Sequence, residues 1–246
     1  MGPDRTRAYH PAVAGAAPRQ TGALTALTDE IVACRACPRL VEWRERVAHE
    51  KRAAFRDEPY WGRPVPGFGD PAARVLVVGL APAAHGGNRT GRIFTGDRSG
   101  DWLFGALHRT GYANQATSVR ADDGLELRDA YVAAAVRCAP PANKPTPAER
   151  DQCLPYLVRE MVLLERVRVI VVLGKFAYDA TARVLAESGS PLPSPRPPFG
   201  HGVEVSSERA VVLGCYHPSQ QNTFTRKLTE PMLDDVFVRA RALSET

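Results

Sequence analysis

The stretch at residues 75–97, VLVVGLAPAAHGGNRTGRIFTGD, decides the fold. Its first four residues, Val75 to Val78, form a continuously apolar run, as expected for a strand that helices cover on both faces. Gly79 and Pro82 end that run. A buried strand that passes into a tight turn and a polar loop is typical of an inner strand of an α/β sheet, which delivers its loop to a crevice. The stretch alone is also compatible with a plain strand-to-helix connection.

The turn after this strand carries little side-chain volume. Ala81, Ala83 and Ala84 have only methyl groups, and Gly86-Gly87 lets the chain turn sharply afterwards. A large, flat group could therefore approach the backbone here.

Outside this stretch, apolar periodicity predicts helices and strands in alternation. Helices are expected at residues 21–34, 38–52, 99–110 (with Ser99 as N-cap), 147–166, after Gly174 to 187, and from 230 onward; further strands are expected at 129–136, 167–173, 203–205 and 210–213. Thr146 and Glu149 fit a capping box. The alternation predicts an α/β fold, a three-layer α/β/α sandwich around a central, mainly parallel four-stranded sheet, with the site at the strand ends.

Composition favours one globular domain. The chain has 246 residues, of which 44% are hydrophobic, and we expect a flexible tail at 1–20 and a single domain at 21–246. No segment has the pattern of a signal peptide or a membrane span, so a cytoplasmic protein without a membrane partner is expected. We also expect a monomer. The net charge of +5 suits a polyanionic partner.

The cysteines indicate metal ligation or reactive thiols, because disulfides are rare in the cytosol. Cys34 and Cys37 form a C-x-x-C pair, Cys138 and Cys153 lie downstream, and Cys215 stands apart. Spacing alone leaves a structural zinc and an iron–sulfur cluster about equally acceptable.

Three loops at predicted strand ends carry the remaining motifs: GLAPAAHGG at 79–87, CAPPANKP at 138–145 and YHPSQQNTF at 216–224. Together with FTGD and the cysteine spacing, they resemble the uracil-DNA glycosylase superfamily, most closely its iron–sulfur-containing family 5. The resemblance runs from Cys34 to about Asn222. It implies a DNA glycosylase that excises uracil in base-excision repair and holds a 4Fe–4S cluster on Cys34, Cys37, Cys138 and Cys153.

The resemblance also assigns the chemistry. Such a reaction leaves negative charge on the departing base, and His217 of HPS would hold that anion through a neutral imidazole N–H. The first motif of family 1 has an acidic residue where this chain has Ala81, so the placing of water would pass to Asp97 of FTGD, with Asn143 as its partner. Each has a plainer alternative: a satisfied loop histidine, a helix cap at Asp97 and a loop-capping amide at Asn143.

A flipped base needs a pocket with an aromatic wall, and Phe94 is the candidate, although a plain core aromatic is the alternative. Ala134 occupies the position of the asparagine that reads uracil in families 1 and 4, which predicts tolerance for bases such as hypoxanthine. The base-binding set is Gly79, Leu80, Ala81, Ala83, Phe94 and Ala134.

DNA contacts are expected from the same loops, through phosphate contacts and through amides that meet the orphaned opposite base. The set is His85, Arg89, Arg92, Lys144, Ser219, Gln220, Gln221, Asn222 and Arg226, and the expected substrate is uracil-containing double-stranded DNA.

The leading hypothesis is a monofunctional glycosylase, because no lysine in the motifs is placed as a Schiff-base nucleophile. Ala81 motivates an alternative, a non-catalytic nucleic-acid-binding iron–sulfur or zinc protein on the same scaffold. A small-nucleotide hydrolase is a more distant third.

Overall fold

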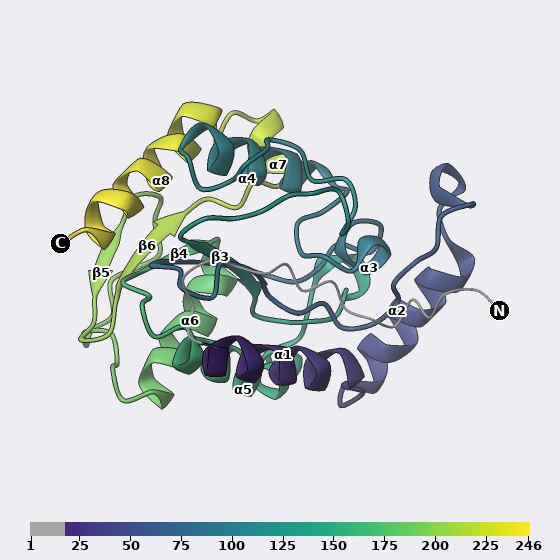
Figure 1. The fold of residues 1–246 in the computed structure, drawn as a ribbon, viewed down its shortest axis with the longest axis horizontal. Helices are drawn as coiled ribbons and strands as arrows, with labels where there is room; N and C mark the ends of the chain where they lie inside the picture. Colours follow the sequence, from purple (N-terminus) through teal and green to yellow (C-terminus); the bar gives the residue numbers. More distant parts are fainter. Residues whose placement is uncertain (1–17) are drawn as a thin grey trace.

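A mixed sheet of six strands, in the order β1-β3-β2-β4-β6-β5, forms the centre of the molecule in a computed structural model that describes residues 18–246 (Figure 1). The strands are β1 (Phe68–Gly69), β2 (Val75–Gly79), β3 (Ala130–Ala134), β4 (Val169–Leu173), β5 (Glu204–Ser206) and β6 (Val211–Cys215). Strands β3, β2, β4 and β6 are parallel neighbours, whereas β1 and β5 pair antiparallel at the two edges. The α/β class is confirmed, but four was too low a strand count. A two-residue strand such as β1 has no periodicity that a sequence could reveal.

The central strands are buried on both faces and lie in register. Val75 of β2 pairs with Ala130 of β3 and with Val169 of β4, so the carboxyl ends of these strands lie at one level. Alternate side chains join two separate cores, one on each side of the sheet. The loops after β2, β3 and β6 therefore converge at one edge, as the motif-bearing loops were expected to do.

Helices cover both faces of the sheet (Figure 1). In that view α4 and α8 lie above it and α1, α5 and α6 below, in agreement with their contacts to one another and to the strands. The helices are α1 (Pro18–Ala33), α2 (Pro38–Glu50), α3 (Gly87–Thr90), α4 (Arg98–Arg109), α5 (Pro147–Leu163), α6 (Lys175–Glu187), α7 (Gln220–Phe224) and α8 (Glu230–Ser244), with short 3-10 helices at Ala53–Phe55 and Pro141–Asn143.

Local capping explains where several helices begin. The capping box of Thr146 and Glu149 at the start of α5 is present as predicted. Helix α4 begins one residue before the predicted cap, because Asp97 and not Ser99 accepts the N–H of Gly100. Helix α7 was not expected; Ser219 caps it within the third motif loop.

Of the predicted tail, residues 1–17 lie outside the described residues, and residues 18–20 already form the start of α1. None of the described helices combines the length and the apolar run needed to cross a membrane.

Candidate active site

A cavity of about 560 Å³ opens at the carboxyl ends of the parallel strands. The three motif loops and the start of α4 form its walls. Its lining consists of Leu80, Ala81, Ala83, Phe94, Asp97, Arg98, Ser99, Asn143, His217, Ser219, Gln220 and Gln221. The structure therefore brings together the three predicted catalytic residues and the predicted aromatic wall.

Asp97 uses its two carboxylate oxygens differently. Oδ1 accepts the backbone N–H of Gly100 at 3.0 Å and caps α4. Oδ2 faces Gly86, where an added methyl group would stand only 2.0 Å from it. Burial raises the pKa of this carboxyl, while the N–H groups of Gly100 and Ser99 oppose the shift. Asp97 is thus a helix cap and a cavity group at once, so the two interpretations of the sequence do not exclude each other.

His217 presents an uncommitted imidazole to the cavity. The described residues include no hydrogen-bond partner for either ring nitrogen, whereas its backbone carbonyl accepts the N–H of Ser219 at 2.8 Å and Nδ2 of Asn222 at 2.9 Å. Burial lowers the pKa of His217 to about 4, so the ring is neutral at pH 7. A neutral imidazole on a fixed backbone can donate one N–H to a ligand, and the protein need not bury a positive charge to do so.

Phe94 closes one side of the cavity. Its ring centroid lies 6.0 Å from that of His217, at an interplanar angle of 35°. A methyl group at Gly79 would stand 2.7 Å from this ring, so the glycine permits the ring to lie on the end of β2. Phe94 is also 6% exposed and belongs to a core cluster. It has the left-handed φ of 53°, which a bulky residue rarely adopts.

Asn143 is exposed in the loop at residues 138–145, which follows β3 and lines the cavity. Its side-chain amide has no partner among the described residues. Ala142 and Asn143 both have left-handed backbone, with φ of 53° and 55°. This conformation costs about 1 kcal/mol or more for a residue such as Ala142, whereas asparagine adopts it readily, and strained residues concentrate at functional sites. The loop therefore holds a free amide at the cavity by means of a strained turn.

The remaining base-binding candidates divide into two groups. Leu80, Ala81 and Ala83 line the cavity. Gly79 and Ala134, which pair across β2 and β3, are buried behind it, and Ala134 is only 1% exposed. These two shape the cavity from below and do not line it.

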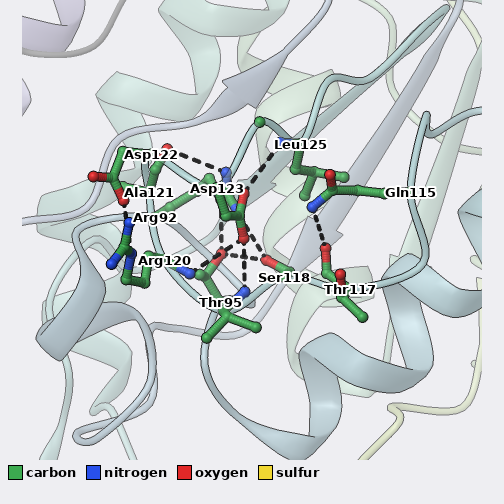
Figure 2. A network of polar contacts seen from close by, with 12 residues as sticks. Arg92, Thr95, Gln115, Thr117, Ser118, Arg120, Ala121, Asp122, Asp123 and Leu125 are labelled. Atoms are coloured by element: carbon green, nitrogen blue, oxygen red, sulfur yellow. Dashed lines mark hydrogen bonds and ion pairs between the residues drawn. The ribbon is translucent and has the colours of Figure 1, made fainter.

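Two predicted phosphate contacts do not agree with the structure, because Arg89 and Arg92 are each only 5% exposed. Figure 2 shows Arg92 in a polar network with Asp123, whose carboxylate it meets at 2.8 and 2.9 Å, and with Ser118 at 3.0 Å. The same carboxylate accepts the N–H of Val119 at 2.7 Å, so this network fixes the loop before β3.

Arg89 has a comparable internal role. It pairs with Glu58 and donates to the carbonyl of Gly96 at 3.1 Å and to that of His85 at 2.8 Å. It thereby ties α3 to the segment that carries Asp97. The predicted DNA contact His85 meets the hydroxyl of Tyr60 through Nδ1 at 2.9 Å.

The third loop keeps only part of its predicted set at the cavity. Gln220 and Gln221 are exposed and line it. The amide group of Asn222 instead donates inward to His217, so that residue supports the imidazole loop. Lys144 and Arg226 are exposed beside the cavity loops.

Sequence reasoning missed two side chains at the cavity mouth. Arg98 lines the cavity, and its guanidinium lies 4.5 Å from the ring centroid of Phe224. Phe224, at the end of α7, is 64% exposed. Their positions directly after FTGD and within YHPSQQNTF were available signals. An exposed aromatic beside an arginine is a suitable stacking surface for a nucleobase.

The four predicted metal-binding cysteines converge beside α2. Cys37, Cys138 and Cys153 pack in one small cluster with Leu40. Burial, with Cys153, Glu149 and Cys34 close by, raises the pKa of Cys37 to about 11. Burial raises the pKa of Cys138 to about 12 against the opposing effect of Arg44. Among the described residues, no three His, Cys, Asp or Glu side chains lie close enough to hold a single metal ion.

Comparison with known proteins agrees with this geometry. A family model described as "Uracil DNA glycosylase superfamily" matches residues 66–240. The "Type-5 uracil-DNA glycosylase" of Mycobacterium tuberculosis is 56% identical over 91% of this chain and 82% of its own length. The protein of that name from Thermus thermophilus is 50% identical over 89% of this chain and 97% of its own length. The one from Pyrobaculum aerophilum is 45% identical over 87% of this chain and 90% of its own length. The chain belongs to the uracil DNA glycosylase superfamily and, within it, to the type-5 family.

Proposed function

We propose that this protein removes uracil from double-stranded DNA by hydrolysing the N-glycosidic bond, as the first step of base-excision repair. Membership of the type-5 uracil-DNA glycosylases supports uracil excision by a monofunctional enzyme. One observation carries the assignment of roles: Phe94 and Asp97 of FTGD, Asn143 and His217 come from three separate segments and line one cavity.

Each of these side chains has a role in the reaction. The flipped base stacks on Phe94, and the neutral imidazole of His217 donates to the base as negative charge develops on it. Asp97 and Asn143 place the water that adds to the sugar. Asp97 orients it through Oδ2, and Asn143 supplies an amide that no other side chain or backbone group of residues 18–246 engages. The departing base leaves an abasic site.

The experiment is single-turnover excision from a duplex with one uracil, followed by alkali to cleave abasic sites. Wild type should convert the strand, and His217→Ala should be slower by about two orders of magnitude with duplex binding nearly unchanged. Binding without any excision by wild type would instead indicate the non-catalytic nucleic-acid-binding protein.

We propose that the enzyme also accepts other deaminated bases such as hypoxanthine. Ala134 supports this, because a buried methyl group at the end of β3 supplies no hydrogen bond that would select one base edge. Parallel assays on duplexes with uracil, hypoxanthine and thymine test it. Excision of uracil alone would contradict it.

Exposed cations around the cavity mouth support a duplex substrate. Arg98, Lys144, Arg226 and Lys227 are all exposed. Replacing Lys144 or Arg226 by Ala should reduce the slope of log affinity against log salt by about one unit each. We further propose a monomer that acts in the cytoplasm, where a bacterium or archaeon keeps its DNA.

We propose that Cys34, Cys37, Cys138 and Cys153 hold a 4Fe–4S cluster. A single zinc ion requires sulfurs at about 2.3 Å from one centre. Cys37, Cys138 and Cys153 pack together and Cys34 lies near enough to affect the pKa of Cys37, so four thiolates, the usual complement of a 4Fe–4S cluster, are available in one place. These residues would join the segment between α1 and α2 to the loop after β3 and to α5, and the cluster would supply no step of the hydrolysis. Anaerobically purified protein should contain iron and acid-labile sulfide, and stoichiometric zinc without sulfide would contradict the assignment.

A further inference from the structure

Arg44 of α2 is a buried cation with a poor counter-charge. Its side chain is 2% exposed. The carboxylate oxygen that approaches it, Oε1 of Glu45, lies 3.9 Å from Nη2, and Glu45 is itself 44% exposed and engaged with Arg35. Nε of Arg44 has no hydrogen-bond partner among residues 18–246. A buried charge without close compensation is strongly unfavourable, so a further negative group is expected at this place.

Elsewhere the fold provides such compensation. Arg137 is 1% exposed, and both its terminal nitrogens donate to Glu160, which is also buried. No comparable carboxylate meets Arg44 in the described part of the chain. Its Nη1 donates to Sγ of Cys138 at 2.9 Å, and its Nη2 donates to the carbonyl of Cys34 at 3.1 Å. Both of these residues belong to the proposed cluster ligands.

We infer that Arg44 is the counter-charge of the iron–sulfur cluster and stabilises its more reduced state. This inference rests on the cofactor proposed above. A neutral thiol compensates a guanidinium poorly, whereas a ligating thiolate shares the negative charge of its cluster. N–H···S hydrogen bonds and nearby positive charge favour the state with one more electron, and therefore raise the reduction potential. Arg44 moves no proton and binds no iron.

The same residue connects the cysteines to the active site. The backbone carbonyl of Arg44 accepts Nδ2 of Asn88 at 3.1 Å, and Asn88, in α3, is 1% exposed. Helix α3 follows Gly86, which lies against Asp97. The guanidinium of Arg44 therefore meets the metal-binding cysteines while its carbonyl holds the helix beside the catalytic loop.

The test compares Arg44→Met, Arg44→Lys and Arg46→Met with wild type. Arg46 is on the same helix but 47% exposed, so Arg46→Met removes equal charge without touching the cysteines. Proteins are purified without oxygen, assayed for iron and sulfide, and studied by voltammetry, in which the cluster exchanges one electron with the electrode. Arg44→Met should have a lower reduction potential and lose its cluster absorbance several-fold faster in air. Arg44→Lys should show a smaller shift, and Arg46→Met should match wild type.

The outcomes separate this inference from the cofactor proposal. Wild type without iron and sulfide overturns the cofactor and, with it, the role of Arg44. An iron-containing wild type whose potential equals that of Arg44→Met overturns the inference and leaves the cofactor in place. A folded Arg44→Met that cannot retain iron supports the inference if Arg46→Met retains it. If circular dichroism shows Arg44→Met to be unfolded, the Arg44→Lys potential decides, and a value equal to wild type overturns the inference.

Discussion

Gly86 and Asp97 are in such close contact that no side chain could be added to the glycine: a methyl group there would stand 2.0 Å from Oδ2 and 2.9 Å from the carboxyl carbon. The backbone of Gly86, with φ of −105°, is not in the left-handed region. Glycine is therefore expected at this position because the Asp97 carboxylate leaves no room for a side chain, and not because of a positive φ.

Gly86→Ala should accordingly displace the Asp97 carboxylate. Because misplacement of a catalytic group by about 1 Å can cost 10²-fold in rate, we expect single-turnover excision to slow by about that factor with duplex affinity nearly unchanged. Gly22→Ala is the matched control, since Gly22 is exposed on α1 and no atom of the described residues lies within 4 Å of its added methyl group. An unchanged rate in Gly86→Ala would show that the position of this carboxylate does not matter.

The two roles of Asp97 can be separated by two substitutions. Asp97→Asn keeps a cap for α4, because Asn caps helices as well as Asp does, but it removes the charge. We expect it to slow excision by about 10²-fold without lowering the melting temperature. Burial raises the folded-state pKa of Asp97, so the ionised form costs stability at neutral pH, and its loss should be neutral or stabilising.

Asp97→Ala, in contrast, should lose both the charge and about 1 kcal/mol of capping energy. Thermal unfolding of both variants beside their excision rates makes the comparison. If Asp97→Asn excises as fast as wild type, Asp97 is a cap only.

The imidazole of His217 predicts a specific dependence of stability on pH. Burial sets its pKa at about 4 in the folded chain, against 6.5 in an unfolded one. As the pH falls below 6.5, the unfolded chain binds a proton that the folded chain does not, so the free energy of unfolding decreases until about pH 4. This contribution amounts to up to about 3 kcal/mol, and it should be absent from His217→Gln.

Denaturant unfolding of wild type and His217→Gln between about pH 4 and 8 measures this difference. Excision should show no titration of His217 between about pH 6 and 8, because the ring remains neutral there. An inflection of the rate near pH 6.5 that is lost in His217→Gln would contradict the low pKa.

Phe224 should matter more for a duplex than for a single strand. Base–aromatic stacking is worth about 1–3 kcal/mol, and only a duplex leaves an unpaired partner base when one base is flipped. Phe224→Ala should therefore slow excision from a duplex about tenfold or more and have less effect on single-stranded substrate. Val238→Ala on α8, also exposed at 59%, is the control for loss of surface apolar area. Equal losses on both substrates would assign Phe224 to general backbone contact.

The sequence predicted the parts of this site that lie in short motifs at strand ends. His217, Asp97, Asn143 and Phe94 line one cavity because β2, β3 and β6 are parallel and their following loops converge. What the sequence could not reveal are pairings across long distances in the chain. Arg92 pairs with Asp123, and Arg89 pairs with Glu58. Two arginines that the sequence suggested were at the surface are therefore buried and ion-paired within the fold.

Local competition explains the other differences. Asn222 was expected at the DNA, but the helical turn of α7 points its amide group to the carbonyl of His217. Ser99 looked like the cap of α4, yet Asp97, two residues earlier, accepts the N–H that defines it. An asparagine amide can contact DNA or a backbone carbonyl, and both serine and aspartate can cap a helix. Only the folded backbone decides between these possibilities.

The two outermost strands have a consequence for how copies of this protein meet one another. Strand β1 spans 2 residues and β5 spans 3, and both run antiparallel to their neighbours. The unpaired backbone N–H and C=O groups of an edge strand can pair with a strand of another molecule. Very short edge strands present few such groups. The sheet that carries the cavity loops is therefore poorly suited to edge-to-edge pairing between molecules. Copies of the protein can then bind DNA close together without aggregating through their backbones.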